Sequence, residues 1–132
     1  MLATLEIKTP ERETLVNITP QLKKLVADSS VKCGRLIAFV PHTTAAITIN
    51  ESADPDVQRD LLVTLKKLIP LSGDYRHAEG NSDAHLKSSL FGASLTLLIE
   101  DGKIVLGTWQ AVYFAEFDGP RSRRLHVRIV ED

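Results

Sequence analysis

Apolar residues recur at every second position along much of the chain, which is the spacing of strands with one buried face. Polar turns such as Pro10–Glu13 and Asp101–Gly102 separate these segments. The expected strands are Leu5–Ile7, Leu15–Ile18, Arg35–Val40, Ala45–Ile49, Leu95–Ile99, Trp109–Phe117 and Leu125–Val130. The pattern therefore predicts a chain made mostly of short strands, with a few helices between them.

Helix signals interrupt the strand pattern in three places. Thr19-Pro20 and Asp54-Pro55 each combine a capping side chain with proline at the first helical position. Gly or Pro then marks where a helix ends. The expected helices run from Thr19 to about Asp28–Ser30, from Asp54 to Pro70, and from Asn81 or Ser82 to Gly92.

The segment Trp109–Phe117 is apolar on both faces, because Val112 and Phe114 alternate with other apolar residues. In a small domain, a second sheet, a helix layer or a neighbouring subunit must cover the second face. Trp109 is expected in the core or at a subunit interface.

The last expected strand is one-sided. Leu125, Val127 and Ile129 should face the core, and the basic residues that alternate with them should face solvent, a subunit interface or an anion. Solvent is the favoured interpretation. These basic residues are Arg124, His126 and Arg128.

Composition narrows the class of protein. The 132 residues fit a single domain, 1–132, and 43% apolar with 25% charged residues is typical of globular proteins. A net charge of −1 gives no general attraction to nucleic acid or to an anionic membrane. The lone Cys33 favours a reducing cytoplasm, and no apolar run of membrane-spanning length or secretory signal is present.

The segment His77–His85 is polar beyond what burial in a core explains. It holds two of the four histidines and several short polar side chains directly before and within the start of an expected helix. Such side chains beside a helix start are suited to a metal or anion site. The segment therefore indicates where function lies before it indicates which function.

Several motifs follow one another in a fixed order along the chain. They are His42-Thr43-Thr44, Asn50–Pro55, Tyr75-Arg76-His77, Asn81, Ala84–Lys87, Leu106–Gln110 and Glu116–Arg121. Together they resemble the secondary thiamine-phosphate synthase family, also called the YjbQ-like family, over about Ile37–Ile129. The N-terminal third is more divergent.

The resemblance implies an α+β fold of two packed, mainly antiparallel β-sheets with flanking helices, assembled as a homotrimer. It also implies a weak, secondary ability to join a pyrimidine diphosphate to a thiazole phosphate. No acidic cluster suited to magnesium on a diphosphate is evident, which fits a slow side activity. No glycine-rich phosphate loop is present either.

His42, His77 and His85 are the candidate metal ligands, with zinc as the expected ion and an open coordination position for chemistry. The eight-residue spacing of His77 and His85 is not that of a helical metal pair, and solvent-facing loop histidines are an equal alternative. Asn81 is expected to cap the third helix, and with the three histidines it completes the candidate catalytic set.

Four residues are candidate substrate contacts. Arg121 follows a Gly-Pro turn and, with Lys87, is a candidate phosphate binder, although surface solvation remains open for Lys87. Gln110 and Glu116 share one face of a strand. For Glu116, an ion pair with an arginine is favoured over a catalytic role.

Two classes of function remain. The first is an enzyme, either the thiamine-phosphate transferase or a metal-assisted phosphate hydrolase. The second is a non-catalytic trimer that binds a metal or a small anionic metabolite. In both, the expected partner is a small phosphorylated or anionic metabolite rather than nucleic acid or membrane.

Overall fold

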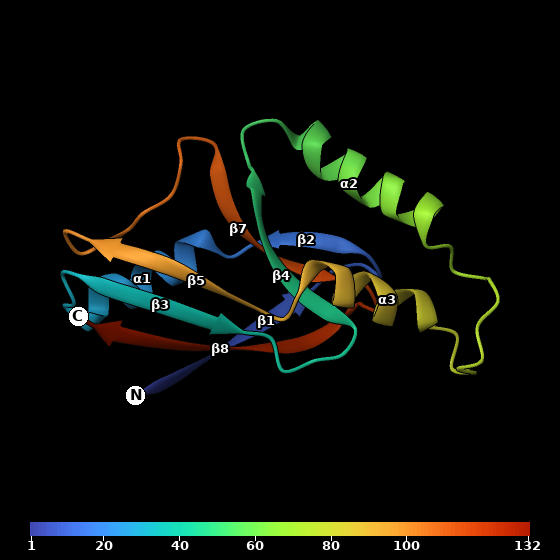
Figure 1. Ribbon diagram of the computed structural model, residues 1–132, viewed down its shortest axis with the longest axis horizontal. Coiled ribbons are helices and arrows are strands. Elements are labelled where there is room, and N and C mark those ends of the chain that lie inside the picture. Colours follow the sequence, from blue (N-terminus) through green and yellow to red (C-terminus); the bar gives the residue numbers. More distant parts are fainter.

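The computed structural model describes residues 1–132, which form eight strands and three helices (Figure 1). The strands are β1 (Leu2–Thr9), β2 (Thr14–Asn17), β3 (Gly34–Phe39), β4 (Ala45–Glu51), β5 (Ser94–Glu100), β6 (Lys103–Ile104), β7 (Gln110–Glu116) and β8 (Arg121–Glu131). The helices are α1 (Thr19–Ser29), α2 (Pro55–Leu68) and α3 (Ser82–Phe91). None of the helices is long and apolar enough to cross a bilayer.

The strands form two antiparallel sheets. The larger has the order β1-β8-β3-β5-β6 and the smaller has the order β2-β7-β4. The chain passes from the smaller to the larger sheet at the short turn between β7 and β8. These two sheets with three helices confirm the expected α+β fold.

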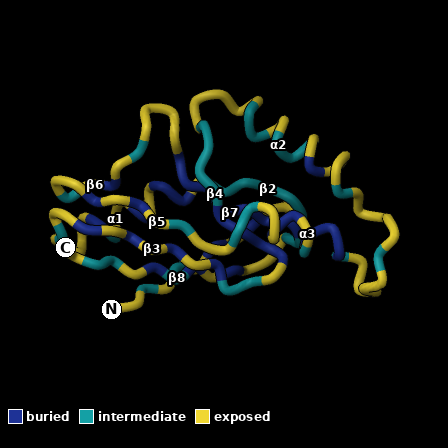
Figure 2. Tube along the Cα trace, in the orientation of Figure 1, coloured by how far each residue is buried: buried dark blue, intermediate teal, exposed yellow.

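The inner faces of the two sheets pack against each other. The main core joins residues such as Leu36 and Leu125 of the larger sheet to Ile47 and Phe114 of the smaller one, and Leu22 of α1 closes one end. The alternation of buried and exposed residues along β3 and β8 is the strand pattern expected from the sequence (Figure 2).

Both faces of β7 are covered, as its two apolar faces predict. Val112 and Phe114 face the larger sheet, whereas Ala115 and Phe117 pack with Leu65 of α2 and other residues of the second cluster. The chain therefore covers this strand by itself, and β7 alone gives no reason for a subunit contact. Trp109 was expected in the core or at an interface, yet it precedes β7 and is 61% exposed in the single chain.

The helix starts follow their sequence signals in part. Asp54 caps α2, because its carboxylate accepts from the backbone N–H of Asp56 at 2.9 Å. Thr19 does not cap α1: it is the first helical residue, and its hydroxyl accepts instead from the backbone N–H of Val112 at 2.8 Å. The Thr19 hydroxyl therefore links α1 to β7 instead of capping the helix.

The turn between β7 and β8 is packed against the N-terminal loop. Gly119 donates its backbone N–H to the carbonyl of Arg12 at 3.0 Å. A side chain at Gly119 would collide with the backbone of Glu11, so only glycine fits here. This turn places the residues on either side of it, Asp118 and Arg121, at the mouth of a cavity.

Candidate functional site

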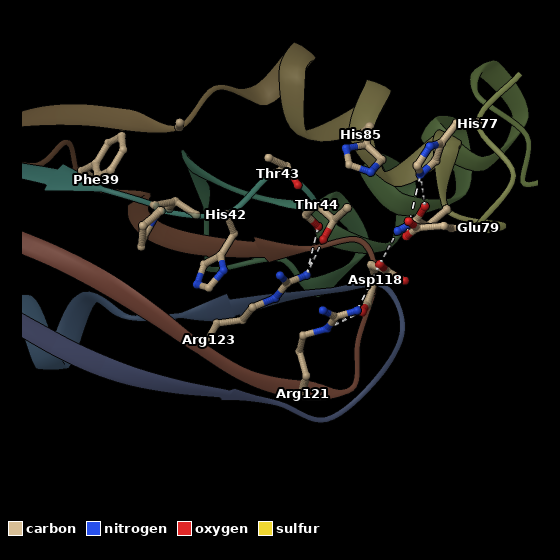
Figure 3. Close-up of a pocket in the computed structure, with 14 residues that line it drawn as sticks. Phe39, His42, Thr43, Thr44, His77, Glu79, His85, Asp118, Arg121 and Arg123 are labelled. Atoms are coloured by element: carbon tan, nitrogen blue, oxygen red, sulfur yellow. Dashed lines mark hydrogen bonds and ion pairs between the residues drawn. The ribbon is translucent and has the colours of Figure 1, made fainter. Parts of the chain in front are cut away.

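A polar cavity of about 780 Å³ opens where the two sheets meet the start of α3 (Figure 3). Its walls are the loop between β3 and β4, the loop before α3, and the turn between β7 and β8. The polar lining residues are His42, Thr43, Thr44, His77, Glu79, Asn81, His85, Asp118, Arg121 and Arg123. The three candidate histidines therefore lie in one cavity, together with Asn81 and Arg121.

A chain of hydrogen bonds crosses this cavity. Arg121 donates to Asp118 twice, from Nε to the backbone carbonyl at 2.9 Å and from a terminal nitrogen to Oδ2 at 3.1 Å. The Nδ2 group of Asn81 also donates to Oδ2 of Asp118, at 2.9 Å. The other end of the Asn81 amide, Oδ1, lies 3.1 Å from Nε2 of His77. Four residues from two segments, the loop before α3 and the turn between β7 and β8, are thus held in one network.

This network assigns the proton of His77. A carboxylate only accepts, so Asp118 requires Asn81 to present its Nδ2 group there and its Oδ1 to His77. Nε2 of His77 must then carry the hydrogen. The neutral ring consequently has its lone pair on Nδ1.

His42 has the opposite tautomer. Its Nε2 accepts from the backbone N–H of Arg124 at 2.9 Å, and a backbone amide can only donate. The hydrogen of the neutral ring therefore lies on Nδ1. Burial lowers the pKa of His42 below its ordinary value of 6.5, and the positive charge of Arg123 lowers it further. At neutral pH His42 is a neutral hydrogen-bond donor.

His77 and His85 are neighbours. Their ring centroids are 5.2 Å apart and the rings meet edge to face, one from the loop before α3 and one from α3 itself. No three His, Cys, Asp or Glu side chains in the chain are arranged to hold a metal ion. His42 would have to release the Arg124 amide before Nε2 could bind one. The expected zinc site on His42, His77 and His85 therefore stays a prediction.

The inner wall of the cavity is a buried ion pair. Arg123 donates from Nε to Oε1 of Glu116 at 2.9 Å and makes a second bond to Oε2, and both side chains are almost fully buried. Thr9 donates to the same carboxylate at 2.7 Å. Burial alone would raise the pKa of Glu116, but the bonds from Arg123 and Thr9 outweigh it and lower this pKa. The expected pairing of Glu116 with an arginine is confirmed.

Three predicted roles were wrong or incomplete. Lys87 is not a phosphate contact, because its side chain leaves α3 on the side away from the cavity and its ammonium is buried between Glu13 and Asp83. Gln110 lies at the far end of β7 and accepts from the backbone N–H of Gly107, so it does not reach the cavity. Asn81 does precede α3, but its side chain makes no capping bond and serves the network with Asp118.

Thr44, Asp118 and Arg123 also line the cavity, although no role is predicted for them from the sequence. Thr44 and Asp118 lie within the motifs named above, whereas Arg123 lies outside them. Arg123 continues the buried alternation of Leu125 and Val127 two residues back, and this signal could have placed it beside Glu116. Thr44 accepts from Arg123 through its hydroxyl at 2.8 Å, which joins the β3–β4 loop to the pair. Asp118 carried no local signal, because its partners are 37 residues away or across a turn.

Comparison with known proteins gives consistent matches over nearly the whole chain. The family profile described as "UPF0047 protein YjbQ-like" matches residues 3–132. A UPF0047 protein of Methanocaldococcus jannaschii is 54% identical over 132 residues, which are all of this chain and 96% of that protein. The UPF0047 protein YugU of Bacillus subtilis is 44% identical over 98% of this chain and 99% of its own.

Solved structures share the fold. The crystal structure of an uncharacterized conserved yjbq/upf0047 family protein from Clostridium acetobutylicum has a TM-score of 0.95 and 53% identity, covering 97% of this chain and 99% of that one. A YbjQ-like protein of unknown function from Sulfolobus solfataricus has a TM-score of 0.94 at 33% identity, covering 100% of this chain and 97% of that one. The match therefore extends to every strand and helix that builds the cavity.

Proposed function

This chain belongs to the YjbQ-like UPF0047 family, and from its cavity we propose that it is an enzyme acting on a small phosphorylated metabolite. The observation that carries the proposal is one open cavity lined by Arg121 and by two histidines, His42 and His77, whose tautomers are fixed by hydrogen bonds to the protein. Such a combination of a fixed positive charge and positioned imidazoles is suited to moving a proton beside a phosphate.

Anion binding falls to Arg121. Its side chain is 48% exposed, and the bonds to Asp118 use Nε and one terminal nitrogen, which leaves the other terminal nitrogen free for a phosphate oxygen. His42, on the loop between β3 and β4, lines the same cavity, and its Nδ1–H is a further neutral donor. Arg123 is neutralised by its pair with Glu116 and also bonds Thr44, so the anion-binding charge is assigned to Arg121 alone.

Proton transfer falls to His77. Nδ1 of its neutral ring has the free lone pair, while the bond from Nε2 to Asn81 holds the ring in place. His85, with its ring 5.2 Å away, is close enough to share the substrate. A histidine oriented in this way is the usual form of a general base.

The specific reaction that we propose follows from the family resemblance: a pyrimidine methylene loses pyrophosphate and is captured by the ring nitrogen of a thiazole phosphate. The C–O bond to pyrophosphate breaks with its electron pair, and the C–N bond forms. Arg121 would bind the departing pyrophosphate, and the cavity would hold both rings together. A metal-assisted phosphate hydrolase is the second candidate, because the same polar lining suits it.

A divalent metal, with zinc as the candidate, is a further proposal for His42, His77 and His85. Bound there, it would supply positive charge for an anionic substrate or hydroxide. The tautomer of His42 argues against this ligand set in the present arrangement, since Nε2 is engaged and Nδ1 carries hydrogen. If the metal is absent and no reaction is found, a non-catalytic metabolite-binding trimer remains.

The test is a pyrophosphate-release assay with the pyrimidine diphosphate, with and without the thiazole phosphate, and with and without zinc or magnesium. Protein purified without a histidine tag is analysed for metals in parallel. Release that depends on the thiazole and is weakened in Arg121→Lys supports the transferase. Release without the thiazole supports a hydrolase. Binding without any release, in every metal condition, would overturn the enzyme proposal.

A further inference from the structure

A second cavity, of about 430 Å³, lies on the other side of α3 and shares no lining residue with the first. It is bordered by the N-terminal loop before β2 and by the end of α2. Its main lining residues are Arg12, Glu13, Lys66, Leu71, Asp83 and Lys87. Nothing in the proposed reaction uses this cavity.

Most of its charges are paired. The Lys87 ammonium bonds to Oε1 of Glu13 at 2.6 Å and to Oδ2 of Asp83 at 2.9 Å. Arg12 binds both oxygens of Asp83, at 3.0 and 3.2 Å, and Oε1 of Glu13 at 2.9 Å. These bonds account for both oxygens of Asp83 and for one oxygen of Glu13.

The second oxygen of Glu13 is the exception. The Glu13 side chain is only 6% exposed, and its Oε2 atom has no hydrogen-bond partner. The ammonium of Lys66 lies 4.0 Å from this oxygen, which is beyond hydrogen-bonding distance, and the Lys66 side chain is 65% exposed. A buried carboxylate oxygen without a donor is costly, and such an atom marks a place where a partner is missing.

We propose that this cavity binds a small zwitterion, such as an α-amino acid, through Glu13 and Lys66. The ligand ammonium donates to Oε2 of Glu13, and the ligand carboxylate accepts from Lys66, so the unbonded carboxylate oxygen and the exposed ammonium each gain a hydrogen-bond partner. Pro70 and Leu71 line the same cavity and offer an apolar wall to a short side chain.

Charge favours a zwitterion over an ion. The lining holds three cations, Arg12, Lys66 and Lys87, and three carboxylates, those of Glu11, Glu13 and Asp83, so the formal charge is zero. A neutral zwitterion preserves this balance, whereas a lone amine or a lone acid would leave one charge without a partner. A metal ion is disfavoured because no three acidic or histidine side chains are arranged to hold one.

The test is a titration of the whole protein with L-alanine, followed by backbone amide NMR shifts. We expect saturable shifts in loop 10–13 and at the end of α2, and at least tenfold weaker binding in Glu13→Gln. Ethylammonium and acetate at the same ionic strength serve as single-charge probes and should bind more weakly than L-alanine. The readout is binding alone, so its failure is separate from that of the proposed reaction.

The exposed partner gives a second variant should Glu13→Gln not fold. Lys66→Glu replaces an exposed side chain, so the fold is retained, and it would repel the ligand carboxylate. We expect this variant to lose L-alanine binding. The proposal is overturned if L-alanine causes no saturable shifts, if acetate alone reproduces them, or if the folded variants bind L-alanine as tightly as the unmodified chain.

Discussion

Asn81 and Asp118 are joined by a 2.9 Å hydrogen bond that links the start of α3 to the turn between the two sheets. Because Asp118 accepts from the Asn81 amide, the other end of this amide is fixed as an acceptor for His77. A carboxylate without any contact to His77 thereby determines which nitrogen of His77 is free. The reactivity of the cavity thus depends on a residue one step removed from the histidine.

Asp118→Asn tests this relationship. An asparagine at 118 can donate to Asn81, so the Asn81 amide can turn over and present its Nδ2 group to His77. We expect the His77 ring to change from Nε2–H to a mixture of tautomers, read from its ¹⁵N shifts. Asp101→Asn, at an exposed turn away from the cavity, is the matched control. Unchanged His77 shifts in Asp118→Asn would show that Asn81 is oriented by something else.

Arg121→Lys tests the phosphate site. Lysine keeps the charge but lacks the planar fork, so it cannot hold Asp118 and a phosphate at once as the guanidinium does. We expect pyrophosphate binding, measured by calorimetry, to weaken by about 1–3 kcal/mol. Arg128→Lys, on the exposed face of β8, should leave binding unchanged. Equal pyrophosphate affinity in the two variants would show that Arg121 only binds Asp118 and does not contact the phosphate.

Lys87→Met tests the buried network behind α3. The change leaves Glu13 and Asp83 short of a buried cation, so we expect the free energy of unfolding in urea to fall by about 3–5 kcal/mol. Lys66→Met removes an exposed ammonium near the same carboxylate and should change stability by no more than about 0.5 kcal/mol. Similar losses in the two variants would contradict the assigned role of Lys87.

Acid should weaken the fold through Glu116 and Asp83. Burial opposes ionisation of both, but hydrogen bonds from Arg123 to Glu116, and from Arg12 and Lys87 to Asp83, lower both pKa values in the folded state. The stabilisation is therefore complete above the ordinary values of 4.5 and 3.8 and is lost as pH falls through the lower folded values. Urea midpoints between pH 7 and pH 3 should decline in this range. Glu116→Gln should be less stable at pH 7 and less sensitive to acid.

The homotrimer remains a prediction. With this structure, we expect the contact between subunits on the larger sheet and not at β7. β7 is covered within the chain, whereas the outer face of the larger sheet exposes Ile37, Phe39 and Leu98. We expect sedimentation velocity to report three chains, and Leu98→Asp to shift the protein toward the monomer. Leu68→Asp, which alters an exposed residue of α2 away from this sheet face, is the control. A stable monomer of the unmodified chain at micromolar concentration would contradict the prediction.

The sheets could be predicted from the sequence because alternation is a local property. The buried positions of β3 and β8 follow the two-residue period directly, and the two-sided burial of β7 was legible in its composition. The sequence does not predict which element covers the second face of β7, because Leu65 of α2 lies 50 residues from Ala115 in sequence. Local patterns indicate what must be buried and not what buries it.

The site could be located but not fully assigned. Polar residues directly before a helix predict a binding site at His77–His85. Residues of this segment do line the cavity. The charged residues were harder, because their partners are distant: Lys87 binds Glu13 across 74 positions, and Arg123 binds Thr44 across 79. No spacing rule connects such residues, so the sequence alone does not predict the buried pairing of Lys87 with Glu13 or the bond from Arg123 to Thr44.

The place of β8 in the larger sheet sets the order in which the cavity can be made. β8 is the last strand in sequence, yet it lies between β1 and β3 and carries Arg121 and Arg123. While the ribosome is still making the earlier strands, β1 and β3 have no common neighbour and the cavity has no arginines. Folding of the site must therefore wait until β8 has left the exit tunnel, and the exposed edges of β1 and β3 are where nascent chains would bind chaperones or one another.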